Sequence, residues 1–328
     1  MPIPLLLVGA GAAAVLLVLF LALATLWLWR ELSKPPPAGG SPYVLPNGLT
    51  ITHWQAAETD FLFEEIWGSE TAYARGGLVF RPGAVILDAG ANIGMFSLFA
   101  AARCGGAARI IAFEPIPSTH AVLKANADAA NAGAHAKVFG GARVAIEALN
   151  VGLSDAPADA VFHHHPHFSV WSTADGGFAE ARLARIEADM PRALSSNPSA
   201  LVRACFPRAL ARALAGAVLQ RKMGKTEAVR VRLETLSSII DARDLGSVID
   251  FLKVDVEGAE LRVLAGIRDE HWARIQQVAL EVENFATKDV IVEKLREHGF
   301  KTSWFASERE RNPGVESEVS MVYGVREA

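Results

Sequence analysis

Residues Val85 to Leu98 read VILDAGANIGMFSL, and this stretch decides how the rest of the chain is interpreted. It opens with a short apolar run that ends in Asp88, as a strand buried on both faces of a parallel sheet does. Glycines follow at positions 90 and 94, and the apolar residues after them recur at helical spacing. The pattern predicts a strand, a glycine turn and a helix, which is the first half of an α/β unit.

The same pattern repeats downstream. Arg109 to Glu114 is a second apolar strand that ends in a carboxylate, and Pro117 is suited to begin a helix that runs to about Asn131. These elements form a βαβ unit with a right-handed crossover. Helices are also expected after residue 258 and over 288–298. Further strands are expected over 144–154, 248–255, 278–283, 301–305 and 318–325.

The segment of about 155–247 is too long for a single crossover helix, so it must contain an insertion. Strands are expected around Val161-Phe162 and over Val229–Leu233, and the strict alternation of the second predicts an edge or half-exposed strand. Residues 192–225 combine apolar residues with basic ones and no acidic ones. They predict a basic amphipathic helix or helical pair, on an anionic membrane surface or simply solvated. The basic residues are Arg192, Arg203, Arg208, Arg212, Arg221, Lys222 and Lys225.

The N-terminal segment from Ile3 to Trp29 contains no charged residue and is followed by Arg30 and Lys34. As a helix it reaches roughly 40 Å, which is enough to cross a hydrocarbon layer of roughly 30 Å. A cleaved signal peptide is the alternative, because residues 22–24 resemble a cleavage site. The length of the run and the lack of a basic start favour a retained, single-pass anchor. The basic flank then predicts that the chain after it faces the cytosol.

Composition excludes several classes of protein. With 51% hydrophobic and 21% charged residues the chain must fold, and a net charge of −4 gives no electrostatic reason to bind nucleic acid. Cys104 and Cys205 lie far apart in the sequence, so neither a disulfide framework nor a zinc ribbon is expected. A reducing compartment fits this cysteine usage.

The glycine turn indicates the cofactor. A dinucleotide site would show G-x-G-x-x-G, whereas here the glycines are four apart and Asp88 precedes the first by two, so the cradle for a pyrophosphate is incomplete. Glu114, at the end of the second strand, is placed to accept hydrogen bonds from both hydroxyls of a ribose. A nucleoside with an amino acid tail and a sulfonium, S-adenosylmethionine, suits these carboxylates.

Four stretches together resemble the FkbM family of S-adenosylmethionine-dependent methyltransferases: Val85–Leu98, Ala112–Pro115, Ile249–Leu264 and Glu58–Ile66. The resemblance implies a Rossmann-like α/β fold with a seven-stranded sheet, helices on both faces and an antiparallel last strand. It also implies methylation, usually at oxygen. The chain departs from the family at Ser237, where an acid is usual, and in a longer, more basic stretch at 172–228. The expected cofactor-binding residues are Asp88, Gly90, Ala91, Asn92, Gly94 and Glu114.

The expected catalytic residues are Lys253, Asp255 and Glu257. They alternate, so if the strand continues they share one face at its carboxyl end. Asp255 is expected to contact cofactor or substrate, and Glu257 to act as general base or substrate ligand. The alternative is a buried ion-pair network that supports the loop. Asn92 is expected to contact the cofactor, to cap the following helix, or both.

Two candidate metal sites were weighed, and we predict no metal. Glu281 and Glu283 follow the fifth strand and would complete an acidic cluster for a divalent cation. His163, His165 and His167 alternate on one side of a strand, but no second cluster assists them. A histidine as base for a hydroxyl substrate stays open.

The sequence therefore predicts an anchor and flank over 1–34, a linker over 35–42 and a methyltransferase domain over 43–328 that contains the basic insertion. We predict a membrane-anchored enzyme that methylates oxygen on a lipid-linked, isoprenoid, glycan or other natural-product acceptor. The alternatives are an N-methyltransferase, an anchored scaffold without catalysis and a dinucleotide oxidoreductase. Expected partners are the acceptor and the membrane, through residues 3–29 and 192–225, with no nucleic acid.

Overall fold

The computed structural model describes residues 26, 39–68, 71–142, 144–164, 227–282, 285–306 and 319–326. Apart from residue 26, these belong to one compact unit that comprises Pro37–Phe178 and Glu227–Ala328. The predicted anchor, except Leu26, and the basic stretch 192–225 lie outside the described residues.

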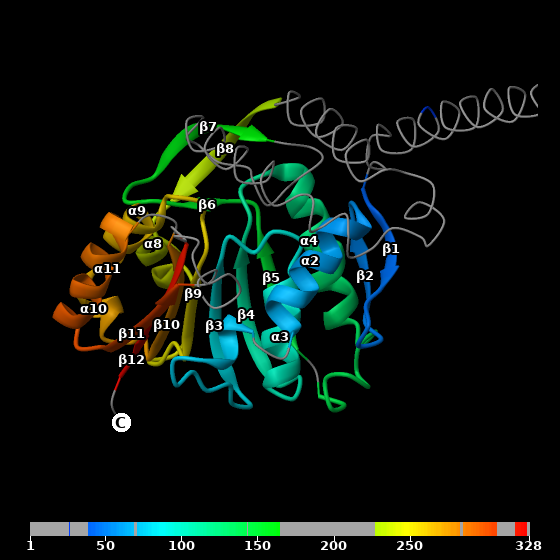
Figure 1. Ribbon diagram of the computed structural model, residues 1–328, viewed down its shortest axis with the longest axis horizontal. Coiled ribbons are helices and arrows are strands. Elements are labelled where there is room, and N and C mark those ends of the chain that lie inside the picture. The colour runs from blue at the N-terminus through cyan, green and yellow to red at the C-terminus, as the bar shows by residue number, and fades with distance from the viewer. Residues whose placement is uncertain are drawn as a thin grey trace, which may run out of the picture. The chain divides into compact units, whose positions relative to one another are not determined.

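Seven strands form one sheet in the order β11-β12-β10-β9-β3-β4-β5 (Figure 1). Neighbouring strands are parallel except at β12, which runs antiparallel to both β10 and β11. The predicted seven-stranded sheet with an antiparallel last strand is confirmed. The strands are β3 (Ala84–Ala89), β4 (Ala108–Phe113), β5 (Ala145–Leu149), β9 (Phe251–Val254), β10 (Gln277–Val282), β11 (Lys301–Ala306) and β12 (Ser320–Val325).

Helices cover both faces of this sheet (Figure 1). The buried residues of α2, α3 and α4 pack in one apolar core, and those of α8, α9, α10 and α11 pack in another. Adjacent strand residues enter different cores, as Ile86 and Leu87 show, because side chains alternate across a strand. The helices are α2 (Ala56–Trp67), α3 (Met95–Arg103), α4 (Pro117–Asn131), α8 (Leu236–Asp241), α9 (Glu260–Ala265), α10 (Asp269–Trp272) and α11 (Phe285–Glu297), with a 3₁₀ turn, η1, at Ala72–Ala74.

The expected third strand, 144–154, is divided between two sheets. Its first part is β5, whereas β6 (Gly152–Leu153) pairs with β8 in a separate three-stranded sheet of order β6-β8-β7. Asn150 lies between the two parts, and its side-chain amide donates to the carbonyls of Glu114 and Pro115 at 2.9 Å each. These hydrogen bonds fix the chain where it leaves the large sheet.

An antiparallel hairpin completes the small sheet. It consists of β7 (Ala158–His164) and β8 (Glu227–Glu234). Val231 and Leu233 of β8 face inward and pack with Ile116, whereas Arg230 and Arg232 are exposed. The predicted half-exposed strand is confirmed. Strand β8 begins at Glu227, beside the end of the insertion that the sequence places at about 172–228.

A second hairpin precedes α2. It pairs β1 (Ser41–Val44) with β2 (Thr50–His53) in a two-stranded sheet that the sequence patterns did not predict. Asn126 on α4 joins this hairpin to the domain, because its side chain accepts from the Thr52 amide at 2.7 Å and donates to the Thr52 carbonyl at 3.0 Å. These two hydrogen bonds fix the hairpin to α4.

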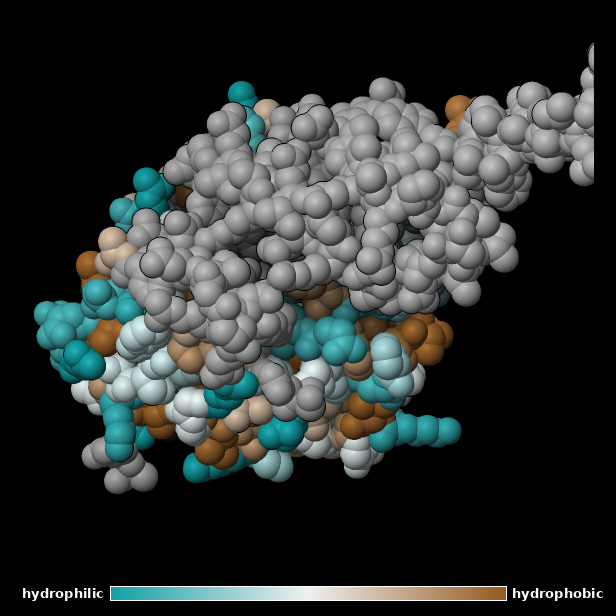
Figure 2. Space-filling model, in the orientation of Figure 1, coloured by the Kyte–Doolittle hydropathy of each residue, from teal (hydrophilic) through white to brown (hydrophobic). Residues whose placement is uncertain are grey.

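Within the part of the chain that the structure describes, no helix is long and apolar enough to cross a membrane. On the face drawn in Figure 2, the described atoms mix hydrophilic and hydrophobic residues. The structure gives no support for the anchor predicted at residues 3–29, which rests on the sequence alone.

The turn after β3 approaches the chain after β9 so closely that only glycine fits. Gly90 has φ +75°, and a Cβ placed there would lie 1.7 Å from the carbonyl oxygen of Asp255. The Asp255 amide donates to the Ala89 carbonyl at 3.1 Å, and the Gly90 and Ala91 amides donate to the Phe113 carbonyl at 3.1 and 2.9 Å. Main-chain hydrogen bonds thus join the loops after β3, β4 and β9.

Replacing Gly90 by Ala is expected to lower the free energy of unfolding by about 2–5 kcal/mol, because it adds left-handed strain to a main-chain clash. Gly83→Ala is the matched control, since Gly83 has φ +84° but nothing lies within 4 Å of its Cβ position. This control should lose only the strain, about 1–2 kcal/mol. Urea denaturation measures both, and equal losses would show that the close approach costs nothing.

Candidate active site

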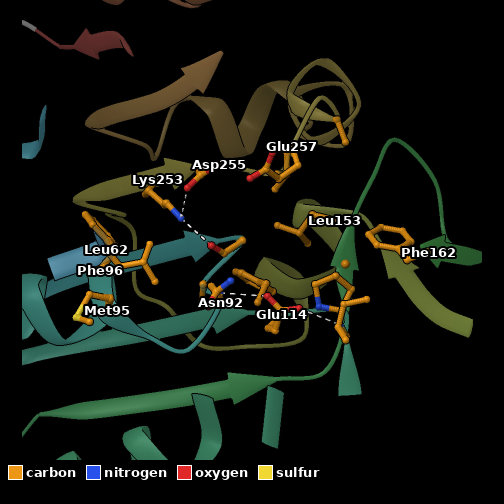
Figure 3. Close-up of a pocket in the computed structure, with 18 of the residues that line it drawn as sticks. Leu62, Asn92, Met95, Phe96, Glu114, Leu153, Phe162, Lys253, Asp255 and Glu257 are labelled. Carbon is orange, nitrogen blue, oxygen red and sulfur yellow. Dashed lines mark hydrogen bonds and ion pairs between the residues drawn. The ribbon is translucent and has the colours of Figure 1, made fainter. Parts of the chain in front are cut away.

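A pocket lies where the chain leaves β3, β4 and β9 (Figure 3). Its charged residues are Glu114, Lys253, Asp255 and Glu257, all at or just after the carboxyl ends of strands of the large sheet. Ligands bind at this edge in open α/β sheets, because the loops that follow neighbouring parallel strands meet there. The sequence placed its candidate residues at the same edge.

Glu114 is 7% exposed and its carboxylate is held by the main chain. One oxygen, Oε2, accepts from the Asn92 amide at 3.1 Å, and the other, Oε1, accepts from the Ile116 amide at 2.9 Å. Burial raises the pKa of Glu114 to about 7, although both amides favour the charged form. Each carboxylate oxygen keeps a further lone pair for a ligand hydroxyl.

Lys253 connects the carbonyl group of Gly90 with the carboxylates of Asp88 and Asp255. Its Nζ donates to the Gly90 carbonyl at 2.7 Å and lies 3.4 Å from Asp88 Oδ1 and 3.3 Å from Asp255 Oδ2. The side chain is 4% exposed, and burial alone would lower its pKa; the carboxylates of Asp255 and Asp88 outweigh burial and raise the pKa above its usual range. Lys253 therefore carries a positive charge between two carboxylates, in the buried network that was the alternative to catalysis.

Asp88 lies behind the glycine turn and not on the pocket wall. It is fully buried, and its Oδ2 accepts from the Ser97 hydroxyl at 2.6 Å while Oδ1 faces Lys253. Its carboxylate is engaged by these two protein groups, so the arrangement favours a supporting role over the expected contact with cofactor. Ser97, which the sequence analysis missed, holds it there from α3.

Alternation in the sequence would place Asp255 and Glu257 on one face of a continued strand, but the two residues do not lie on one strand. Strand β9 ends at Val254, and Glu257 has φ +54° with Gly258 at φ +92°, so the chain turns before Glu257. Both side chains nonetheless line the pocket, and Figure 3 shows them beside Lys253 on the side away from Asn92 and Glu114. The loop after β9, and not the strand itself, therefore places Asp255 and Glu257 in the same pocket.

Asn92 contacts Glu114 through its main-chain amide. Its amide donates to Glu114, its side-chain oxygen accepts from the Ile93 amide at 2.7 Å, and its φ is +50°. Helix α3 begins at Met95 with Gly94 as its N-cap residue, so the expected capping by the Asn92 side chain is wrong. Gly90, Ala91 and Asn92 all line the pocket, whereas Gly94 packs behind it, where a Cβ would lie 2.9 Å from Leu123.

The remaining candidates lie elsewhere. His163 is exposed on β7, while His165, His167 and Glu283 fall outside the described residues. The neighbouring His164, which was not a candidate, is buried with its Nε2 3.3 Å from the Ser118 hydroxyl. Within the described ranges, no group of three or more His, Cys, Asp or Glu residues could hold a metal ion. Ser237 is buried away from the pocket, where its hydroxyl lies 2.8 Å from His271 Nδ1.

Two apolar walls of the pocket were not predicted from the sequence. One combines Leu62 and Ile66 of α2 with Met95 and Phe96 of α3, and the other combines Ile116, Leu153 and Phe162. The first lies near Lys253, whose Nζ is 5.9 Å from the centre of the Phe96 ring, and the second adjoins Glu114 through Ile116. Figure 3 shows Leu62 and Phe96 on one side of the pocket and Leu153 and Phe162 on the other. The spacing of Leu62 and Ile66 on one helix face was the available signal.

Comparison with known proteins identifies the family. Residues 88–302 match the family described as the methyltransferase FkbM domain. The 31-O-demethyl-FK506 methyltransferase FkbM of Streptomyces tacrolimicus is 35% identical over 257 residues, which cover 78% of this chain and 87% of that protein. The methyltransferase sdnD of Sordaria araneosa is 30% identical over 278 residues, which cover 82% of this chain and 91% of that protein.

Two further relatives match only part of a longer chain. The AMB antimetabolite synthetase AmbE of Pseudomonas aeruginosa is 34% identical over 265 residues, and these cover 79% of this chain but 11% of AmbE. A crystal structure of a methyltransferase FkbM from Methylobacillus flagellatus has 12% sequence identity and a TM-score of 0.44, and the match covers 80% of this chain and 47% of that one.

The pocket fits the cofactor that such methyltransferases use. Glu114 offers one acceptor site on each oxygen for the two ribose hydroxyls, and the adjoining wall of Ile116, Leu153 and Phe162 suits an apolar purine face. The carboxylate of Asp255, at the opposite side, suits a cationic group. The chain therefore belongs to the FkbM family of methyltransferases, and its cofactor is S-adenosylmethionine.

Proposed function

We propose that this protein transfers a methyl group to an oxygen atom of an acceptor bound in the pocket between Glu114 and Glu257. The supporting observation is that one pocket contains Glu114, which we assign to the ribose, and a second pair of carboxylates, Asp255 and Glu257. The Streptomyces tacrolimicus relative is a 31-O-demethyl-FK506 methyltransferase, which supports oxygen over nitrogen as the atom that accepts the methyl group.

When bound, S-adenosylmethionine supplies a methyl group activated by a sulfonium. The protein then has to hold the acceptor hydroxyl in line and to receive its proton. We assign proton acceptance to Glu257, and contact with cofactor or acceptor to Asp255. Lys253 keeps its proton because of its raised pKa, so it acts by positioning Asp255 and the Gly90 carbonyl.

The pKa of Glu114 predicts how cofactor affinity depends on pH. Only the ionised carboxylate can accept from both hydroxyls, and burial raises its pKa to about 7. Protonation below that pH competes with binding, so the Kd for S-adenosylmethionine should rise about tenfold between pH 8 and pH 6. Calorimetric titration at a series of pH values measures this.

Glu114→Gln is the matched control for that titration, because it keeps the size of the side chain and cannot ionise. At pH 8 its affinity should be about 10–100-fold weaker, as expected for lost charge-assisted hydrogen bonds. Its Kd should then lack the tenfold component of the pH dependence. An unchanged affinity in this folded variant would refute the ribose role of Glu114.

The role of Glu257 predicts a loss of rate without a loss of cofactor. Glu257→Gln should lower methyl transfer by about 10²–10⁴-fold, as for loss of a general base, while the Kd for S-adenosylmethionine stays within about threefold. Transfer of a tritiated methyl group into organic extracts of host membranes is the assay. Asp159→Asn, at an exposed position on β7, is the control and should retain full activity. If Glu257→Gln is equally active, another group accepts the proton.

We further propose that residues 3–29 anchor the enzyme as a single-pass helix with the domain on the cytosolic side. The support is the charge-free run and its basic flank. The basic residues over 192–225 would add attraction to an anionic leaflet, of about 1 kcal/mol for each one near the surface. An anchored enzyme suits an acceptor that resides in the membrane, such as a lipid-linked, isoprenoid or glycan precursor.

A variant lacking residues 1–34 should leave the membrane fraction and bind S-adenosylmethionine with unchanged affinity, because the compact unit begins at Pro37 and its first strand at Ser41. Fractionation followed by calorimetry tests this. N-terminal sequencing of the full chain provides the second readout: a mature protein that starts near residue 25 would show a cleaved signal peptide instead of an anchor.

A further inference from the structure

We propose that the wall formed by Leu62, Ile66, Met95 and Phe96, here called the α2 wall, binds the body of the acceptor, and that the acceptor is an uncharged alcohol with an apolar chain. The inference rests on the proposed function and names the substrate class of the same pocket. It follows from which parts of the pocket the cofactor leaves to another ligand.

The two apolar walls adjoin different polar groups. Ile116, Leu153 and Phe162 lie beside Glu114, since the Ile116 amide itself donates to that carboxylate. A nucleoside held by Glu114 places its base next to its ribose, so this wall is assigned to the cofactor. The α2 wall lies instead beside Lys253 and Asp255, on the other side of the pocket (Figure 3). It is therefore the apolar surface left for the acceptor.

The chemistry of the α2 wall sets the character of that acceptor. Leu62 and Ile66 are 8% and 7% exposed and pack in the same core as Met95 and Phe96. Leu62 and Ile66 are packed against other residues of this core, and they present aliphatic surface without hydrogen-bonding groups to the pocket. An acceptor with hydroxyl groups along its body would leave those groups unpaired against this wall, which weakens binding by about 5–150-fold for each one.

The charges that line the pocket exclude an anionic acceptor. The described lining residues carry three carboxylates, Glu114, Asp255 and Glu257, and one ammonium, Lys253. That ammonium is already engaged by the Gly90 carbonyl and by two carboxylates. A carboxylate or phosphate beside the reacting hydroxyl would meet net negative charge, whereas an uncharged alcohol would not.

The wild-type chain loaded with S-adenosylhomocysteine allows a direct test without any substitution. Saturation-transfer NMR titrations would compare 1-butanol, 1-hexanol and 1-octanol, which differ only in apolar length. Affinity should rise with each added methylene, by up to about fourfold. Octanoate, which matches 1-octanol in length but carries a charge, should bind at least about tenfold more weakly. Equal binding of butanol and octanol, or of octanol and octanoate, would overturn the proposal.

Two variants of α2 assign the binding to this wall. Leu62→Ala should weaken 1-octanol binding by about tenfold, because it removes aliphatic surface from the pocket. Phe61→Ala is the matched control: Phe61 is the adjacent residue on the same helix, is 56% exposed and does not line the pocket, so octanol binding should not change. Equal effects of the two substitutions would place the alcohol elsewhere.

Calorimetry with S-adenosylhomocysteine separates failure of this inference from failure of the proposed function. If the full chain and Leu62→Ala both bind that nucleoside with similar Kd but show no chain-length dependence for alcohols, the α2 wall does not bind the acceptor and the cofactor site stands. If the full chain does not bind the nucleoside, the assignment of Glu114 has failed and the proposal fails with it.

Discussion

The active site depends on one buried ammonium group. Lys253 belongs to β9, yet its Nζ contacts the Gly90 carbonyl and the Asp88 carboxylate of the neighbouring strand's end, and Asp255 of its own loop. Removing a buried charge's partners is costly, so each of these contacts holds the other two in place. Position 90 must be glycine, because the two loops approach so closely that a Cβ would lie 1.7 Å from the Asp255 carbonyl oxygen. These contacts join the loop after β3 to the loop that carries Asp255 and Glu257.

Glu114 shows the opposing demands that this arrangement places on a carboxylate. Burial disfavours its charge and raises its pKa to about 7, while the amides of Asn92 and Ile116 favour the charge. The Asn92 amide can reach Glu114 from the β3 turn, where Asn92 adopts a positive φ. The glycine turn therefore shapes the pocket and also helps to keep the Glu114 carboxylate near the balance between its two protonation states. The linkage of cofactor binding to pH follows from this balance.

The core of the fold could be predicted from local patterns. Short apolar runs ending in a carboxylate located β3 and β4, and Pro117 and Asn131 marked both ends of α4 as the structure has them. The site residues followed from the rule that ligands bind at the carboxyl edge of such a sheet. The strand does not continue to Glu257, which was the condition for Asp255 and Glu257 to share a face, because alternation in sequence carries no information on whether the backbone stays extended. The positive φ values of Glu257 and Gly258 decide that point.

The parts that sequence patterns missed are those held by contacts between distant segments. The β1–β2 hairpin depends on Asn126, 74 residues after Thr52, and β6 pairs with β8 across the long segment that separates them. Neither contact leaves a local signal, although β6 contributes Gly152 and Leu153 to the pocket. The charged lining residues come from the sheet edge, whereas Leu62, Ile66, Leu153 and Phe162 come from outside the seven strands. The apolar residues of these outer elements, which include part of the wall proposed for the acceptor, can therefore vary without removing the Lys253 contacts to Gly90, Asp88 and Asp255.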